Sequence, residues 1–270
     1  MTPAEQDADQ RLKDKVAIVT GAGRGIGRGI ALAFGAAGAK VVCASRTEAT
    51  VEAVAREIRD AGGEAIAVCC DIAERADIER MVSAAVSAYG GVDILVNNAQ
   101  GHGTREAPAG TPVLQPIETY DEGHWTFAMD TGPVASIRAM KAVFPFMKAR
   151  GKGKIINLGS RWGQLGYEGA LAYNAAKEAI RALSRTAARE WGQYGINVNV
   201  INPTIVTDAY DAHAQEHPEE AAQGAAMIPL KRVGRPLRDL GPVAVFLASD
   251  ESDYLTGMTV MVDGGKYMTP

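Results

Sequence analysis

The chain has 270 residues, with 28 lysines and arginines against 32 aspartates and glutamates, for a formal net charge of −4. Hydrophobic residues make up 47% of it, which is typical of a globular protein and excludes intrinsic disorder. The mild acidity without a basic block argues against a nucleic-acid partner, and no run reaches the roughly 18 apolar residues of a membrane span.

Short β-branched runs alternate along the chain with longer alanine-rich stretches of helical periodicity. Several runs are apolar on both faces, as expected of strands that helices cover on both sides. The stretches Ile26–Ala37 and Thr47–Ala61 are long enough for crossover helices. The sequence therefore predicts an α/β fold, a doubly wound parallel sheet of about seven strands of the Rossmann type. The predicted strands are Val16–Thr20, Lys40–Ser45, Ala65–Asp71, Asp93–Asn97, Lys154–Leu158, Asn197–Asn202 and Thr259–Val262.

No linker or internal repeat divides the chain, so we expect a single domain over residues 13–270 after an N-terminal extension, residues 1–12. Length alone would also allow two domains of roughly 150 residues. Two stretches break the strand–helix alternation. Gly101–His124 is predicted to be a loop, and residues 204–236 are predicted to form a mobile, partly helical flap. Loops of this length are usually lids or binding rims.

The charges of residues 1–15 are mixed in sign, which is unlike a signal peptide. Three cysteines, two of them adjacent at Cys69 and Cys70, cannot build a disulfide framework. We therefore expect a cytoplasmic protein without a membrane partner. Because Cys69 and Cys70 fall in a predicted strand without metal-ligand partners, we expect both in the core.

The first predicted strand runs directly into a glycine-rich loop, with glycine at every odd position from 21 to 29. Such a loop allows a tight turn, close approach of a pyrophosphate to the backbone, and a helix N-terminus that faces the anion. The spacing Gly-x-x-x-Gly-x-Gly differs from the general dinucleotide fingerprint, and a flexible turn without a ligand is the alternative. The strand before and the helix after favour a dinucleotide site. Its expected cofactor-binding residues are Gly21, Arg24, Gly25, Ile26 and Gly27.

The second predicted strand ends at Ser45, where an acidic residue would select NAD by binding the adenosine ribose. A serine does not repel a 2′-phosphate, and Arg46 together with Arg24 can pair with that phosphate. NADP(H) is therefore favoured as cofactor and NAD(H) is the alternative. If NAD(H) were used, Arg46 would be an ordinary solvated surface charge.

The alanine-rich stretch Leu171–Trp191 predicts a helix that carries Tyr173 and Lys177 four residues apart, and therefore on one face. A lysine ammonium one turn away favours the phenolate and lowers the tyrosine pKa from its usual value of about 10. Ser160 follows a predicted strand at its carboxyl end, where its hydroxyl can hydrogen-bond a substrate oxygen. The pair alone is a weak pattern, equally compatible with an exposed helix face.

Together these motifs resemble the short-chain dehydrogenase/reductase family over about Lys13–Tyr267. Four segments carry the resemblance: Thr20–Gly27 resembles the family's cofactor loop, Asn97-Asn98-Ala99 its central structural motif, Ser160 with Tyr173 and Lys177 its catalytic set, and Val262–Gly265 its last strand. The resemblance implies hydride transfer between NAD(P) and a carbonyl or an alcohol. It also implies an oligomer, a tetramer or a dimer, and the alanine-rich faces of Ala135–Met147 and Ala175–Ala188 could pack there or inside the subunit.

Residue roles follow from the same resemblance. Tyr173 would be the general acid in reduction and the base in oxidation, Lys177 would lower its pKa and hold the nicotinamide ribose, and Ser160 would polarise the carbonyl. The implied cofactor contacts are Asp71 and Ile72 at the adenine, Asn98 and Ala99 along the ribose path, and Pro203 with Ile205 over the nicotinamide, where Val206 is an alternative to Ile205.

Three residues depart from the family pattern: Gln100 and Thr204 stand where glycine is usual, and Asp130 where the family commonly has a catalytic asparagine. Residues after Ser160 are expected to ring the substrate, namely Trp162, Gln164 and Tyr167, although packing is an equal alternative for Trp162 and Gln164. Arg161 or Arg105 could pair with a substrate carboxylate or phosphate, with a surface role favoured for Arg105.

His213 and His217 stand four residues apart, but a solvated flap surface is favoured over a zinc site, so no metal is expected. The leading function is that of an NADP(H)-dependent ketone reductase or secondary-alcohol dehydrogenase. A 3-oxoacyl-carrier-protein reductase of fatty-acid synthesis is an alternative. From a different class, a non-catalytic NADP(H)-binding sensor or scaffold would have no reason to keep the catalytic set.

Overall fold

Seven parallel strands form the central sheet, as predicted, in the order β3–β2–β1–β4–β7–β8–β9. The computed structural model describes residues 10–268, apart from the side chains of residues 208, 209 and 213. The predicted third strand ends two residues early, at Cys69. The strands are β1 (Val16–Thr20), β2 (Lys40–Ser45), β3 (Glu64–Cys69), β4 (Ile94–Asn97), β7 (Gly153–Leu158), β8 (Ile196–Pro203) and β9 (Thr259–Val262).

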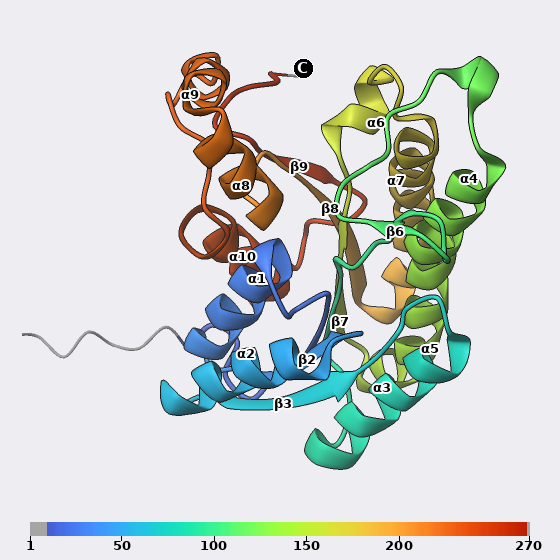
Figure 1. Ribbon diagram of the computed structural model, residues 1–270. Coiled ribbons are helices and arrows are strands. Elements are labelled where there is room, and N and C mark those ends of the chain that lie inside the picture. The colour runs from blue at the N-terminus through green and yellow to red at the C-terminus, as the bar shows by residue number, and fades with distance from the viewer. Residues whose placement is uncertain (1–9, 269–270) are drawn as a thin grey trace, which may run out of the picture.

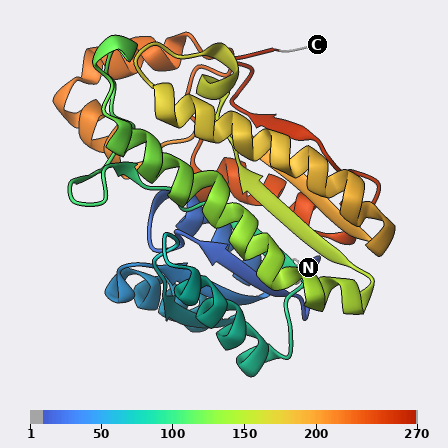
Figure 2. The ribbon, with the colours of Figure 1, turned by 90° about the vertical axis from the view of Figure 1, so that its right-hand side faces the viewer.

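Helices cover both faces of the sheet, and two hydrophobic clusters fill the space between the layers (Figure 1). The helices α1 (Gly25–Ala36), α2 (Glu48–Asp60) and α10 (Gly241–Ala248) pack on one face. The helices α3 (Arg75–Tyr89), α5 (Ala135–Arg150) and α7 (Leu171–Trp191) lie side by side on the other (Figure 2). No described helix is long and apolar enough to cross a membrane.

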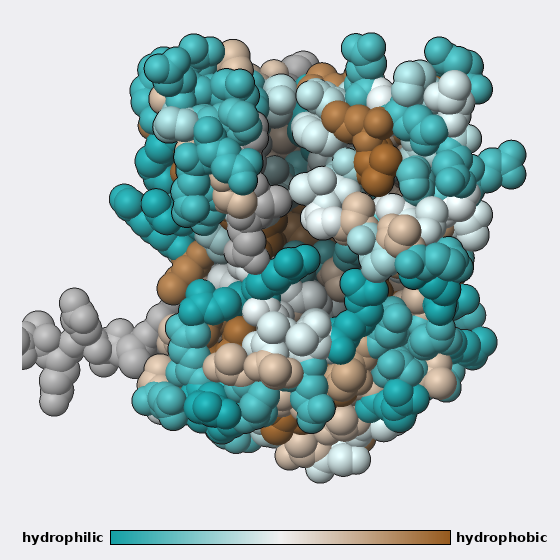
Figure 3. Space-filling view, in the orientation of Figure 1, coloured by the Kyte–Doolittle hydropathy of each residue, from teal (hydrophilic) through white to brown (hydrophobic). Residues whose placement is uncertain are grey.

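The strand order reverses at β1, which pairs with β2 on one side and with β4 on the other. Backbone loops leave β1 and β4 in opposite directions at such a reversal, and a crevice opens beyond the carboxyl ends of the two strands. α6 (Arg161–Leu165) follows β7, and α8 (Asp208–Glu216) and α9 (Pro218–Ala226) follow β8. In Figure 3 the surface is hollowed between the segments of α8 and α9 and those of α4 (Glu122–Met129) and α6.

The two stretches that break the alternation have more structure than a plain loop. The first contains a small hairpin, β5 (His102–Gly103) with β6 (Pro108–Ala109), and α4 begins inside it at Glu122. The predicted flap contains α8 and α9, so its partly helical character is confirmed. A π-helical turn, Asp130–Val134, joins α4 to α5 around Pro133, which cannot donate a backbone hydrogen bond.

The core starts earlier than the predicted domain boundary. Leu12 is fully buried, and its N–H donates to the carbonyl of Ala37 at 2.9 Å. Residue 12 therefore belongs to the domain and not to the N-terminal extension. The alanines of α5 and α7 are likewise part of the core: Ala139 and Ala188 lie in the cluster beneath these helices. The alanine-rich faces could pack against another subunit or inside this one, and these residues pack inside it.

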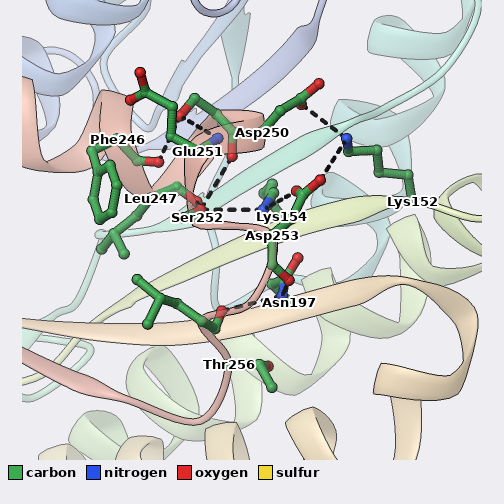
Figure 4. Close-up of polar contacts among 12 residues, drawn as sticks. Lys152, Lys154, Asn197, Phe246, Leu247, Asp250, Glu251, Ser252, Asp253 and Thr256 are labelled. Atoms are coloured by element: carbon green, nitrogen blue, oxygen red, sulfur yellow. Dashed lines mark hydrogen bonds and ion pairs between the residues drawn. The ribbon is translucent and has the colours of Figure 1, made fainter.

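A polar cluster fastens the amino ends of β7 and β8 to the segment after α10 (Figure 4). The Lys154 side chain is 3% exposed, and its Nζ lies 2.8 Å from Asp253 Oδ1 and donates to Ser252 Oγ at 3.1 Å. Burial lowers the pKa of Lys154, while the Asp253 carboxylate acts in the opposite direction. Lys152 pairs with Asp250 at 2.9 Å. These contacts cover the amino ends of β7 and β8, whereas the crevice lies beyond the carboxyl ends of the strands.

Candidate active site

Ser160, Tyr173 and Lys177 come together at the carboxyl end of β7. Ser160 caps the N-terminus of α6, and its Oγ accepts the N–H of Trp162 at 3.2 Å. Tyr173 and Lys177 leave the first turns of α7 on one face. Lys177 Nζ donates to the carbonyl oxygen of Leu158, the last residue of β7, at 2.8 Å. This bond fixes the helix against the strand end that carries the serine.

Burial controls the protonation of this group. It raises the pKa of Tyr173, against which the hydrogen bond with Ser160 acts. It also lowers the pKa of Lys177 to about 7. The expected lowering of the tyrosine pKa is therefore not what the structure gives, because desolvation outweighs the hydrogen bond with Ser160. At neutral pH Tyr173 is protonated, the form that can donate a proton to a carbonyl oxygen.

Two aromatic residues contact the ring of Tyr173. The Trp162 ring centroid lies 5.9 Å away in an edge arrangement, and Trp162 itself stacks on Tyr167 at 4.0 Å. The His102 ring lies 5.5 Å from that of Tyr173. Burial and the charge of Lys177 lower the pKa of His102 to about 4, so its imidazole is neutral. No motif pointed to His102, because only the fold brings β5 to α7.

The glycine loop has the shape that a pyrophosphate needs. Gly25 has a φ of +51° and nothing within 4 Å of the position a Cβ would take. A Cβ on Gly27 would lie 2.2 Å from the carbonyl oxygen of Gly21, so the turn closes only with glycine there. Arg24 caps α1 without a side-chain hydrogen bond, and the first turn has no acidic residue. The free N–H groups of this helix end fit a dinucleotide phosphate.

Thr20 and Asn98 fasten the loop to β4. Thr20 Oγ1 accepts the N–H groups of Asn98 and Ala99 at 3.0 and 3.1 Å. The Asn98 amide donates to the carbonyl oxygens of Thr20 and Gly21 at 2.8 and 3.3 Å. The side chain of Asn98 thus positions the loop, and the expected place of Asn98 and Ala99 along the ribose path stays a prediction. Thr20 was part of the recognised motif, but its role as an acceptor was not foreseen.

The adenosine end of the crevice has two cations. Arg24 and Arg46 are both exposed, and neither forms an ion pair with another described residue. Asp71, half-buried after β3, accepts the N–H of Ala73 at 2.9 Å, and Ile72 packs against the second core cluster. The roles expected for these four residues, around an adenosine phosphate and an adenine, stay predictions.

Backbone bonds single out Ile205 at the nicotinamide end. After Pro203, the N–H of Thr204 donates to Val262 at 2.9 Å and the N–H of Val206 donates to Gly234 at 2.8 Å. No backbone bond to the N–H of Ile205 exists within the described part of the chain. Ile205, and not Val206, is therefore the residue whose N–H remains for a ligand amide.

Gln100 and Asp130, which depart from the family pattern, differ in their burial and in their contacts. Gln100 is half-buried beside Gly132, and both of its amide atoms are enclosed without a partner. Asp130 is exposed, and no polar contact within residues 10–268 joins it to Tyr173 or Lys177. Thr131, the next residue, instead accepts the N–H of Gly101 at 3.0 Å and so holds the loop before His102.

Other candidates fall outside the site. The described residues contain no group of three or more metal-ligating side chains. The side chain of His213 lies outside the described part. Arg105 donates to Glu74 at 2.9 and 2.7 Å in an exposed ion pair, which fits the surface role. Cys70 is buried, and burial raises its pKa to about 12, but Cys69 is exposed, so its expected place in the core was wrong. The strand ends at Cys69, at the rim of the sheet.

Comparisons with known proteins agree with this geometry. A family model described as enoyl-(acyl carrier protein) reductase matches residues 21–266. Galactitol 2-dehydrogenase from Agrobacterium fabrum is 38% identical over 96% of this chain and 100% of that protein. The 3-oxoacyl-acyl-carrier-protein reductase FabG from Staphylococcus epidermidis is 36% identical over 94% and 100%.

Among solved structures, one from Beutenbergia cavernae is described as a proposed NAD(P)-dependent gluconate 5-dehydrogenase with NADP bound at low occupancy. It is 36% identical, has a TM-score of 0.83, and the match covers 94% of this chain and 97% of that one. The chain therefore belongs to the short-chain dehydrogenase/reductase family, oxidoreductases that bind nicotinamide cofactors.

Proposed function

We propose that the protein is an NADP(H)-dependent carbonyl reductase that also oxidises the corresponding secondary alcohol. The observation that carries the proposal is the group of Ser160, Tyr173 and Lys177 at the carboxyl edge, beside a glycine cradle for phosphate. When bound, the nicotinamide supplies the hydride for the carbonyl carbon. Tyr173 gives its phenolic proton to the carbonyl oxygen, and the Ser160 hydroxyl holds that oxygen in place.

Loss of the proton donor tests this function. Tyr173→Phe should lower kcat for ketone reduction by about 10²- to 10⁴-fold. NADPH binding, followed by fluorescence, should stay within about threefold because the ring and its neighbours remain. Full activity of this variant would contradict the mechanism.

The choice of cofactor rests on Ser45, Arg24 and Arg46. The two guanidinium groups have no acidic partners in the described chain, and a charge-assisted pair with the 2′-phosphate contributes roughly 1.5–3 kcal/mol. Arg46→Asp should shift the NADPH/NADH ratio of kcat/KM towards NADH by about 10²-fold. The solved relative with NADP bound supports this choice. An unchanged ratio would contradict the choice of NADP(H).

A second candidate substrate is a 3-oxoacyl group on a carrier protein, which the 36% identity to FabG favours. Comparing 3-oxoacyl thioesters with free ketones in the same assay separates the two reactions. A non-catalytic sensor or scaffold is the candidate from another class, and it would bind NADPH tightly without reducing any carbonyl.

Self-association into a dimer or tetramer is also part of the proposal. α5 exposes Ile137 at 43%, beside a surface groove of about 320 Å³ between α3 and α5. An apolar side chain over such a groove is suited to a second copy of the chain. Light scattering should give a mass of two or four times 28.4 kDa, and a monomer would refute the assembly.

A further inference from the structure

Arg161 places a positive charge on the segment that carries Ser160. It follows Ser160 and begins α6. Its Nη1 donates to Gln164 Oε1 at 3.0 Å, and its Cζ lies 5.5 Å from the centre of the Tyr267 ring. Both contacts are with uncharged groups, and no acidic side chain of the described chain forms an ion pair with it.

The guanidinium contacts Gln164 and Tyr267, and each of these two residues is fixed by another segment. Gln164 Oε1 also accepts from Asn202 Nδ2 at 3.0 Å, which ties α6 to the end of β8. Tyr267 is fixed in turn, because its N–H donates to Asp263 Oδ2 at 2.9 Å and Asp263 is only 6% exposed. A group held in this way loses little conformational freedom when it binds a ligand.

Several polar atoms around Arg161 have no hydrogen-bond partner in the described part of the chain. Arg161 Nε is enclosed without an acceptor, and Asn202 Oδ1 is enclosed without a donor. Arg161 Nη2 has no hydrogen bond and is not among the enclosed atoms, so it remains open to a ligand. Charges removed from water are normally neutralised, and the guanidinium fork matches the two oxygens of a carboxylate. Arg105, by contrast, already binds Glu74 through both terminal nitrogens.

We propose that Arg161, held by Gln164 and Tyr267, is an anion subsite of the active site, and that the natural substrate is a ketone or secondary alcohol bearing a carboxylate. The proposal rests on the reductase function above. Ser160, on one side of Arg161, hydrogen-bonds Tyr173, and Trp162, on the other side, contacts its ring. Along the backbone, Arg161 therefore stands between two residues that contact Tyr173. The chain length of the best acid substrate measures how far its carboxylate must reach.

Matched pairs of ketones test the subsite. The acids 4-oxopentanoate, 5-oxohexanoate and 6-oxoheptanoate are each compared with their methyl esters, with NADPH as reductant. In the parent protein, kcat/KM for the acid should exceed that for the ester by at least about tenfold at the best chain length. This preference should shrink as ionic strength rises.

Variants assign the preference to the residue. Arg161→Gln should bring the acid-to-ester ratio close to 1, and Arg161→Lys should keep part of it, since lysine keeps the charge but not the fork. Arg105→Gln, which alters an arginine already paired at the surface, should have the parent ratio. Pentanoate should inhibit the parent competitively where pentanamide does not, and this difference should vanish in Arg161→Gln.

Each outcome decides the matter. If Arg161→Gln does not fold, as a melting curve would show, Arg161→Lys and the inhibition of the parent protein carry the test. Equal use of acid and ester by the parent, or an equal loss for both in Arg161→Gln, overturns the subsite and leaves the reductase. If no ketone, charged or neutral, is reduced, the proposed function fails and the subsite with it.

Discussion

Thr20→Val tests whether the hydroxyl that joins β1 to β4 supports the cofactor loop. Thr20 is 3% exposed, and its Oγ1 accepts two backbone N–H groups, those of Asn98 and Ala99. Valine has nearly the same shape but no hydroxyl, so both N–H groups lose their acceptor, and the Val96 carbonyl oxygen loses the hydroxyl that donates to it at 3.1 Å. An unsatisfied buried donor costs about 1–3 kcal/mol, and the lower half applies because Asn98 and Ala99 are partly exposed. The expected destabilisation is roughly 2–4 kcal/mol, summed over both groups.

Urea unfolding followed by circular dichroism measures this difference. A loss of that size should also lower Tm by roughly 5–15 °C, at about 2–4 °C per kcal/mol for a domain of this size. Thr20→Ser is the matched control, because it keeps the hydroxyl and loses only a methyl group. The reasoning is refuted if Thr20→Val is as stable as Thr20→Ser.

Three further changes follow from the site. Gly27→Ala should weaken NADPH binding at least about tenfold, since its Cβ would lie 2.2 Å from the carbonyl oxygen of Gly21. Gly224→Ala is the control: no atom lies within 4 Å of the position of its Cβ, so it should bind NADPH like the parent. Burial lowers the pKa of His102 to about 4, so between pH 6.5 and 4 the unfolded chain binds a proton that the folded chain does not. As the pH falls through this range, the free energy of unfolding of the parent should drop by about 1–3 kcal/mol relative to that of His102→Phe. Equal urea midpoints at every pH would contradict this. Burial lowers the pKa of Lys177 to about 7, so above pH 7 the unfolded chain holds a proton that the folded chain has lost. The free energy of unfolding of the parent should therefore rise relative to that of Lys177→Met between pH 7 and 10. A difference between the two proteins that stays constant with pH would argue against a desolvated lysine.

The helices and strands were predictable because their signals are local. The range predicted for the helix that carries Tyr173 and Lys177, Leu171–Trp191, is the range of α7, and β1 has both of its predicted ends. Alanine-rich periodicity and runs of β-branched residues encode these elements without reference to the rest of the chain. The glycine loop was equally readable, because a turn that Cβ atoms would block leaves glycines at fixed spacing.

Motif spacing also predicted which residues would meet, but not their electrostatics. Ser160 and Tyr173 adjoin as expected, yet the tyrosine pKa rises where a fall was expected. Spacing along a helix gives the distance between two side chains, whereas desolvation depends on every segment packed around them.

The sequence by itself predicted the family and the doubly wound sheet of this protein, and it singled out Ser160, Tyr173 and Lys177 as the proposed catalytic group. These predictions follow from local periodicity and from motifs in a fixed order. Only the tertiary structure decided that His102 lies against Tyr173, that Tyr267 holds the guanidinium of Arg161, and that Cys69 faces solvent. Such contacts join residues far apart in the chain, and no local pattern encodes them, because they arise when loops from different strands meet at one edge of the sheet.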